Sequence, residues 1–113
     1  GRDTRIWLLS PRKVIEALIH ASDLPASAWG VNRVLNLPGN TAAVGEMIDI
    51  LRRIAGDAVA DRIEIRPDPR IEALVLSWPV RFRNDRALRL GFSADENVES
   101  ILRAYIEDQG IVL

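Results

Sequence analysis

Four side chains near the start of the chain have the charge and spacing to bind an anion. Arg5 lies in the apolar run Thr4–Leu9, and Ser10, Arg12 and Lys13 follow where a helix is expected to begin. The Ser10 hydroxyl can accept a hydrogen bond from an unpaired N–H of the first helical turn, and a proline fits the next position because no N–H is needed there. Cationic side chains beside free backbone N–H groups suit a carboxylate or a phosphate. This turn therefore predicts a site for a small anion.

Two further arginines, Arg81 and Arg83, lie in a segment that connects two expected helices. Connecting segments often carry functional side chains, and the arginine fork matches the two oxygens of a carboxylate. The alternative is that they are ordinary surface residues, since Lys13 is the only lysine and arginine supplies the other basic residues. For Arg5 we favour the functional interpretation, whereas for Arg12, Arg81 and Arg83 both interpretations stay open.

The chain contains no complete set of catalytic residues. Ser10 and Lys13 match the S-x-x-K spacing of penicillin-recognising acylases, but the companion S-D-N and K-T-G segments are absent, so the N-cap role explains Ser10 better. Neither a G-x-G-x-x-G turn nor a P-loop follows any expected strand, and Tyr105 has no lysine four residues later. With no cysteine and His20 as the only histidine, a cysteine or multi-histidine metal site is excluded. We therefore predict no catalytic, cofactor-binding or metal-binding residue in this chain.

Length and composition limit the class of protein further. The chain has 113 residues, enough for one domain with one core, and its net charge of −1 gives no bulk attraction to nucleic acid or to membranes. No apolar run approaches the roughly 20 residues that span a bilayer, and the lack of cysteine and of an export signal suits a cytoplasmic protein. Since the chain starts at Gly1 and 48% of its residues are hydrophobic, we expect a longer protein that covers some of this apolar surface.

The spacing of apolar residues predicts alternating strands and helices in a single lobe, residues 1–113. We expect three short strands, Thr4–Leu9, Val34–Leu37 and Ile63–Arg66. We expect five helices, from Pro11 to about Asp23, from about Thr41 to Gly56, from Pro69 to Trp78, from Asn84 to Gly91 and from Ser93 to Gly110. This order indicates an α/β fold with at least one strand in a parallel setting. Because three strands cannot cover so many helices, the fold should be incomplete by itself.

Three local signals refine these elements. Asp68 before Pro69 predicts a capped helix start, and Ser93 with Glu96 predicts a capping box for the last helix. Trp29 lies in a loop that also contains proline and glycine, and we expect its ring to cover the core rather than to stack on a ligand.

Nine short motifs follow one another along nearly the whole chain: Thr4–Arg12, Ala17–Ala21, Asn36–Gly39, Gly45–Met47, Pro67–Pro69, Ser77–Pro79, Arg81–Phe82, Leu90–Phe92 and Ile101–Asp108. Together they resemble the C-terminal third of the extended short-chain dehydrogenases/reductases, the NAD-dependent epimerase/dehydratase family. Within that family they look most like a branch that acts on a small sugar acid.

The resemblance implies an enzyme made of two parts. In such enzymes an N-terminal Rossmann part carries the glycine-rich turn, the catalytic tyrosine and lysine, and the NAD or NADP cofactor. The present residues would be the C-terminal substrate-binding lobe, which completes the substrate pocket and adds a late strand to the cofactor part. The expected activity, oxidation of a small sugar acid such as D-erythronate, belongs to the full-length parent. This chain alone would bind no cofactor and would not be an enzyme.

The resemblance also assigns contacts to the substrate. Arg5 matches the arginine that opens an R-x-[FYW] strand and contacts substrate phosphate in related sugar-nucleotide epimerases, and Trp7 is the aromatic residue of that strand. Arg12 stands where relatives often have aspartate, which suits a smaller acidic substrate. Arg83 replaces a usual aspartate and Ala43 a usual hydroxyl residue, so the exact substrate stays open. We predict substrate contacts from Arg5, Trp7, Ser10, Arg12 and Arg81.

Two hypotheses from different classes follow from these observations. The first is the substrate-binding portion of an NAD-dependent oxidoreductase, whose partners are a small anionic substrate and the N-terminal Rossmann part. The second is a non-catalytic module that binds a small anion or a protein. A lobe of a nucleotide-sugar epimerase or dehydratase is a further alternative. We also expect a homo-oligomer, and no contact with nucleic acid or membrane.

Overall fold

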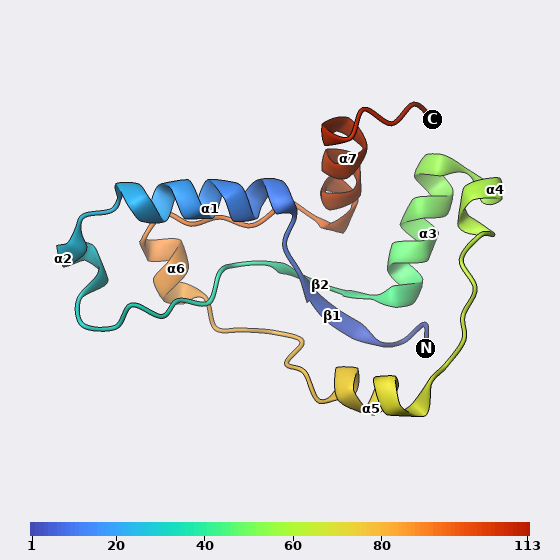
Figure 1. Ribbon diagram of the computed structural model, residues 1–113, viewed down its shortest axis with the longest axis horizontal. Coiled ribbons are helices and arrows are strands. Elements are labelled where there is room, and N and C mark those ends of the chain that lie inside the picture. The colour runs from blue at the N-terminus through green and yellow to red at the C-terminus, as the bar shows by residue number, and fades with distance from the viewer.

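A computed structural model describes all residues, 1–113, as a mixed fold of seven helices and a two-stranded sheet (Figure 1). In chain order the elements are β1 (Arg5–Leu8), α1 (Pro11–Asp23), α2 (Ala26–Trp29), β2 (Asn40–Ala43), α3 (Val44–Ala55), α4 (Asp57–Ala60), α5 (Pro69–Leu76), α6 (Asp85–Arg89) and α7 (Val98–Asp108). The mixed α/β class predicted from the sequence is confirmed. The structure has two strands rather than three and seven helices rather than five, and the two additional helices, α2 and α4, are single short turns that leave no periodic signal.

The sheet differs from the prediction in pairing as well as in size. β1 and β2 pair antiparallel, with Trp7 opposite Thr41 and Leu8 opposite Asn40, so the expected parallel strand is absent. The amide of Val44 donates to the carbonyl of Thr4 at 2.9 Å, which carries the pairing into the start of α3. β2 therefore runs directly into α3, and this helix begins at Val44 rather than near Thr41.

Two predicted strands, Val34–Leu37 and Ile63–Arg66, are irregular segments in the structure. A strand needs a hydrogen-bonded neighbour, and the only sheet consists of β1 and β2. Arg86 holds the first segment instead, because its guanidinium donates to the carbonyls of Trp29, Asn32 and Val34 at 2.6, 2.6 and 3.2 Å. The apolar composition of these segments therefore predicted strands, but neither segment has a neighbouring strand to pair with.

Helix α1 begins as the sequence predicted. Ser10 has extended backbone angles, and its Oγ accepts a hydrogen bond from the amide of Lys13 at 3.1 Å, with Pro11 in the first turn. Helix α5 begins in the same way, because Asp68 Oδ1 accepts hydrogen bonds from the amides of Arg70 and Ile71. Both predicted caps are confirmed.

The predicted start of the last helix is wrong. The capping box is formed by Asn97 and Ser100, and α7 begins at Val98. Asn97 Oδ1 accepts from the Ser100 amide at 2.8 Å, while Ser100 Oγ accepts from the Asn97 amide at 3.1 Å. Ser93 has another role, since its Oγ accepts a hydrogen bond from Lys13 Nζ at 3.2 Å.

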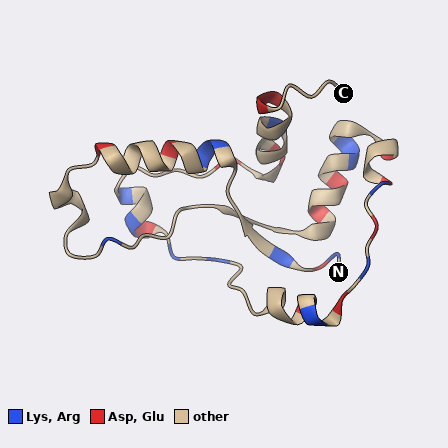
Figure 2. Cartoon of the chain, viewed as in Figure 1, with Lys and Arg blue, Asp and Glu red and all other residues tan.

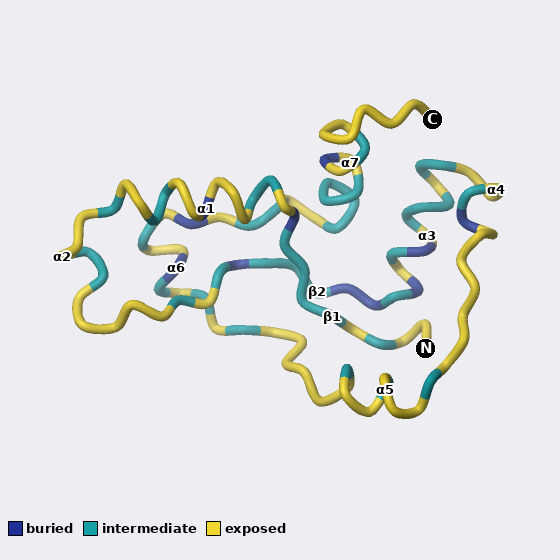
Figure 3. Tube along the Cα trace, viewed as in Figure 1, coloured by how far each residue is buried: buried dark blue, intermediate teal, exposed yellow.

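The molecule is flat, with extents of 51 × 36 × 17 Å and a radius of gyration of 16.6 Å. A compact domain of this length would have a radius of gyration of about 13 Å. Only 11 of 113 residues are buried, and Figure 3 shows them scattered along the trace rather than gathered at a centre. One small core cluster consists of Ala17, Ala87 and Phe92, and Trp29 packs against it as predicted. The fold has little core of its own.

Helix α1 is apolar on more than one side. Ala17 faces the core cluster beneath the helix, yet Ile15, Leu18 and Ile19 are 57, 68 and 59% exposed, and Val14 is 37% exposed. We call these four exposed residues the outer face of α1. A helix that is apolar on opposite sides is normally covered on both sides. None of the helices combines the length and the hydrophobicity that crossing a membrane requires.

Candidate anion-binding site

Strand β1 places Arg5 and Trp7 on one face of the sheet, because side chains alternate along a strand. Arg5 does not stand alone. Its Nη1 lies 3.3 Å from Oε1 of Glu46, which belongs to the first turn of α3. The two side chains are 44 and 54% exposed, so the ion pair is long and open to solvent. Such pairs contribute about 1 kcal/mol or less, and another carboxylate can compete for the arginine.

A hollow of about 340 Å³ opens beside Arg5 and is otherwise lined by apolar and aromatic residues. We call it the aromatic hollow, and its lining consists of Arg5, Ile6, Trp7, Trp78, Pro79 and Phe82. Trp7 and Phe82 meet edge to face, with ring centroids 5.6 Å apart and an angle of 61° between the rings. This contact ties the connector between α5 and α6 to β1. The hollow thus combines a cation with flat apolar walls.

Gly39 permits the position of the Trp7 ring. A Cβ atom at Gly39 would lie 2.8 Å from two atoms of the indole and 2.7 Å from the carbonyl oxygen of Leu8. Both are shorter than a side chain tolerates, and the nearby backbone cannot move without disturbing the β1–β2 pairing. Gly39, the last residue of the Asn36–Gly39 motif, therefore leaves the space that the Trp7 ring occupies in the wall of the aromatic hollow.

Arg81 lies next to Phe82 in the connector, and its side chain is exposed. It takes part in none of the ion pairs of the structure, and the same holds for Arg83. Figure 2 shows acidic and basic residues interspersed over the chain, with basic residues in this connector. Of the five predicted contact residues, the structure thus brings Arg5 and Trp7 together and places Arg81 beside a wall of the same hollow.

Ser10 lies under the turn between β1 and α1 and is only 1% exposed. Its amide donates to Asp95 Oδ2 at 2.9 Å and its hydroxyl to Asp95 Oδ1 at 2.6 Å, while the hydroxyl also caps α1. Asn40 adds a hydrogen bond to the Asp95 carbonyl at 2.9 Å. Ser10 is absent from the lining of the aromatic hollow. Its visible role is to fasten the turn to the loop before α7.

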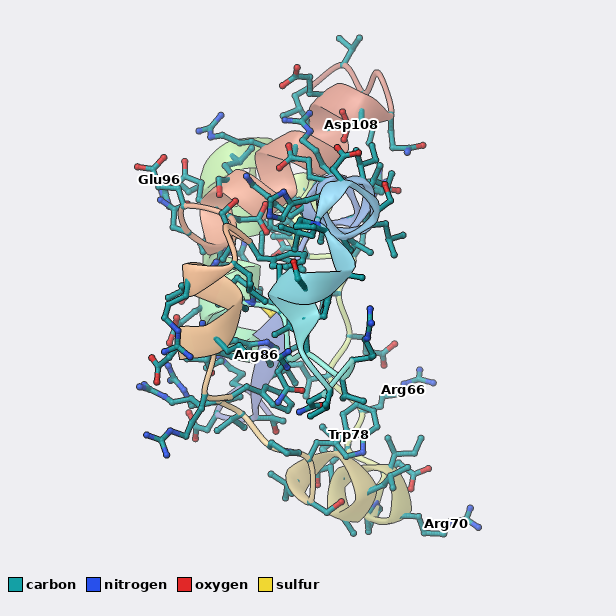
Figure 4. The ribbon with its side chains drawn as sticks, turned by 90° about the vertical axis from the view of Figure 1, so that its left-hand side faces the viewer. Arg66, Arg70, Trp78, Arg86, Glu96 and Asp108 are labelled. Atoms are coloured by element: carbon teal, nitrogen blue, oxygen red, sulfur yellow. The ribbon has the colours of Figure 1, made fainter.

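Arg12 makes a two-pronged ion pair with Asp108 at the end of α7, with Nη2–Oδ1 and Nε–Oδ2 distances of 2.6 and 3.2 Å. Figure 4 shows Asp108 at the far end of α7, away from Trp78. The hydrogen bonds raise the pKa of Arg12 and hold the pKa of Asp108 below its ordinary value. The structure therefore separates Arg12 from Arg5 and engages it with α7.

Replacing Asp108 by asparagine should reduce the stability of the chain near neutral pH and flatten its decline in acid. The folded-state pKa of Asp108 lies below the unfolded value, so its contribution is fully present above the ordinary carboxyl range and is lost as pH falls through the lowered pKa. Urea unfolding at several pH values measures this. Glu107→Gln is the matched control, because Glu107 lies 3.7 Å from Arg12 and is 78% exposed. Parallel pH profiles for wild type and Asp108→Asn would contradict the expectation.

Three side chains of the site were not found by sequence reasoning. Glu46, Trp78 and Phe82 belong to different segments, and only the fold brings them to β1. The available signals were the motifs Gly45–Met47, Ser77–Pro79 and Arg81–Phe82, which contain these three residues but do not show which segments lie side by side. The structure contains no cluster of three or more histidine, cysteine, aspartate or glutamate side chains suited to a metal ion.

Comparison with known proteins agrees with the predicted resemblance. The chain is 43% identical over 109 residues to D-erythronate dehydrogenase from Cupriavidus necator, a match that covers 96% of this chain and 34% of that enzyme. It is 36% identical over 107 residues to D-erythronate dehydrogenase from Haemophilus influenzae, which covers 95% of this chain and 34% of that enzyme. No model of a protein family matches the chain.

Among solved structures, the nucleoside-diphosphate-sugar epimerase from Agrobacterium tumefaciens has the same fold over this length. The TM-score is 0.89 at 35% sequence identity, and the match covers 96% of this chain and 32% of the epimerase. The resemblance is therefore confirmed: this chain is a relative of D-erythronate dehydrogenases and of a nucleoside-diphosphate-sugar epimerase, and it spans about one third of the length of each.

Proposed function

We propose that these residues form the substrate-binding portion of a dehydrogenase that acts on a small sugar acid such as D-erythronate. The observation that carries the proposal is the aromatic hollow, where Arg5 stands at an otherwise apolar wall in a chain similar to D-erythronate dehydrogenases. An arginine fork suits the carboxylate of such an acid. The flat walls suit its short carbon chain.

Glu46 gives Arg5 a partner in the absence of a substrate. Because the Arg5–Glu46 pair is long and half exposed, a substrate carboxylate can replace Glu46 at little cost. Arg81 is the second candidate, since it is exposed and unpaired beside Phe82. In this proposal Arg5 holds the carboxylate and Arg81 adds positive charge at the entrance.

The residues of this chain do not fit a nicotinamide dinucleotide. Such a cofactor needs a glycine-rich turn between a strand and a helix, where backbone approaches the pyrophosphate closely. The β1–α1 turn has Ser10 and Pro11 instead, and its buried polar groups are engaged by Asp95. Gly45, at the start of α3, donates its amide to the carbonyl of Arg2 at 2.8 Å, and Arg2 covers the space beside it. In our proposal NAD or NADP is held by the other two thirds of the enzyme.

The outer face of α1 supports a partner of this kind. Four apolar side chains on a well-formed helix lie open, while the relatives are about three times as long as this chain. We infer that the remaining part of the parent enzyme covers this face. The flat shape and the small core follow from that arrangement, because most of the missing contacts would come from the other part.

A nucleotide-sugar substrate is the alternative that one comparison favours. The epimerase from Agrobacterium tumefaciens shares the fold, and Arg81 with Arg83 offers unpaired positive charge that a diphosphate would match. The small sugar acid is preferred because both dehydrogenases carry that substrate in their names and the aromatic hollow holds one cation at its wall.

Purified full-length parent enzyme should reduce NAD or NADP when D-erythronate is added, and NADH absorbance measures the rate. Nucleotide sugars assayed in parallel should be neither oxidised nor epimerised. The 113-residue chain alone is the control and should show no turnover, since it lacks a place for the cofactor. Epimerisation of a nucleotide sugar without oxidation of any small sugar acid would replace the proposal by its alternative.

A further inference from the structure

Trp78 is a large aromatic residue that the fold leaves open. Its side chain is 54% exposed and belongs to none of the three aromatic contacts of the structure. Figure 4 shows it beside α5, on the side that faces the rest of the molecule. Trp78 does not pack against the core cluster, so the exposed part of its ring is available to a ligand.

The backbone at Trp78 is nonetheless restricted locally. Its amide donates to the carbonyl of Val75 at 3.0 Å, which continues the last turn of α5. Pro79 follows directly, and a proline restricts the backbone of the residue before it. An exposed ring on a fixed backbone is a prepared contact surface, because little conformational entropy is lost when a ligand packs on it.

The aromatic hollow, which Trp78 lines, differs in charge from a second hollow beside it. Trp7 and Phe82 stand between two hollows, of about 340 and 310 Å³. The smaller one is lined by Trp7, Leu9, Leu35, Asn36, Leu37 and Phe82 and contains no charged residue. Only the hollow with Trp78 also has Arg5 on its wall. An anion with an apolar surface therefore finds both matching groups only beside Trp78.

We propose that Trp78 is a specificity-determining residue, whose ring packs against the carbon chain of a short polyhydroxy acid while Arg5 holds the carboxylate. The inference rests on the proposed function and adds the residue that recognises the chain. The C–H edges of a sugar acid carry partial positive charge and suit the negative face of an indole. A carboxylic acid without such a chain binds Arg5 alone and gains nothing from Trp78.

The test uses the full-length parent enzyme with D-erythronate as substrate and acetate as a competing carboxylate without a hydroxylated chain. Trp78→Ala should raise KM for D-erythronate about tenfold and leave the inhibition constant of acetate unchanged. Trp78→Phe keeps a flat ring and should stay within about threefold of wild type. Arg5→Ala should weaken D-erythronate and acetate together. Circular dichroism confirms that each variant is folded.

The outcomes separate this inference from the proposed function. If Trp78→Ala leaves KM within about twofold of wild type, or weakens acetate as much as D-erythronate, the role of Trp78 is overturned, while loss of activity in Arg5→Ala keeps the proposed function. If Trp78→Ala behaves as expected but Arg5→Ala is unaffected, Trp78 is supported and the carboxylate lies elsewhere. If the parent oxidises no small sugar acid, the proposed function fails and the role of Trp78 fails with it.

Discussion

Replacing Arg5 by alanine in the full-length parent enzyme should lower kcat/KM for a small sugar acid by about tenfold to two-hundredfold. One charge-assisted hydrogen bond to a carboxylate contributes roughly 1.5–3 kcal/mol, and Arg5 is the one cation on the wall of the aromatic hollow. Steady-state kinetics measures the loss. Arg5→Lys should recover part of it, because lysine keeps the charge but not the fork.

The matched control for Arg5 is Arg2→Ala. Arg2 also pairs with an acid of α3, at 3.1 Å from Asp49, and its side chain is 49% exposed against 44% for Arg5. It does not line the aromatic hollow. Removing Arg2 should therefore leave kcat/KM within about twofold of wild type. Equal losses in the two variants would show that both arginines act only through the fold, and unchanged kinetics in Arg5→Ala would remove Arg5 from the site.

A lysine at position 18 should destabilise the parent enzyme far more than this chain. Leu18 is 68% exposed here, so Leu18→Lys should change the free energy of unfolding of the 113-residue chain by about 0.5 kcal/mol or less. In the parent, where we infer that the outer face of α1 is covered, an unpaired lysine would be buried at a cost of about 2–5 kcal/mol. Thermal unfolding of both proteins measures the difference.

Self-association gives a second readout of the same substitution. The wild-type chain should associate through its uncovered apolar surface, and Leu18→Lys should shift light scattering toward the monomer. Val112→Lys is the control, because Val112 is 95% exposed and lies outside α1. Equal effects of the two substitutions on the parent, or a compact monomeric wild-type chain, would contradict the covered face.

Local signals in the sequence predicted the starts of helices well. Ser10 and Asp68 each precede a proline and cap a helix, because their side chains can reach the next amides in almost any tertiary context. Ser93 failed as a cap because α7 begins only at Val98, where Asn97 and Ser100 form the capping box, and the Ser93 hydroxyl accepts a hydrogen bond from Lys13. Capping signals therefore predicted the start of a helix where a proline followed directly, and failed where another capping pair lay a few residues further along the chain.

The strands could not be predicted with the same success. Val34–Leu37 has the composition of a buried strand, yet Arg86 takes one of its carbonyls and no strand lies beside it. β2, in contrast, contains two alanines and a threonine and has little strand character by itself. It forms because β1 lies in register with it. Pairing depends on neighbours that a single sequence does not reveal.

The site was only partly visible in the sequence for a related reason. Arg5 and Trp7 share a strand face, so spacing alone placed them together. Arg12 is also cationic and close in sequence, but it forms an ion pair with Asp108 at the end of α7. Trp78 lines the hollow and Glu46 pairs with Arg5 only because the fold brings distant segments to β1. Charge and spacing identified the candidates, but the geometry of each ion pair separates them, since Arg12 is held by two short contacts and Arg5 by one longer contact.

The fastening of Ser10 to Asp95 has a consequence for how the chain folds. These residues are 85 positions apart, and the Arg12–Asp108 pair closes a loop of 96 positions. Closing a loop costs more entropy as it lengthens, and contacts between distant residues form slowly. Helices α3 and α4, which are neighbours in sequence and in contact, can form early. Among these residues the turn at Ser10 is synthesised early, yet it is fixed only after Asp95 and α7 have been made, so within this lobe the order of folding opposes the order of synthesis.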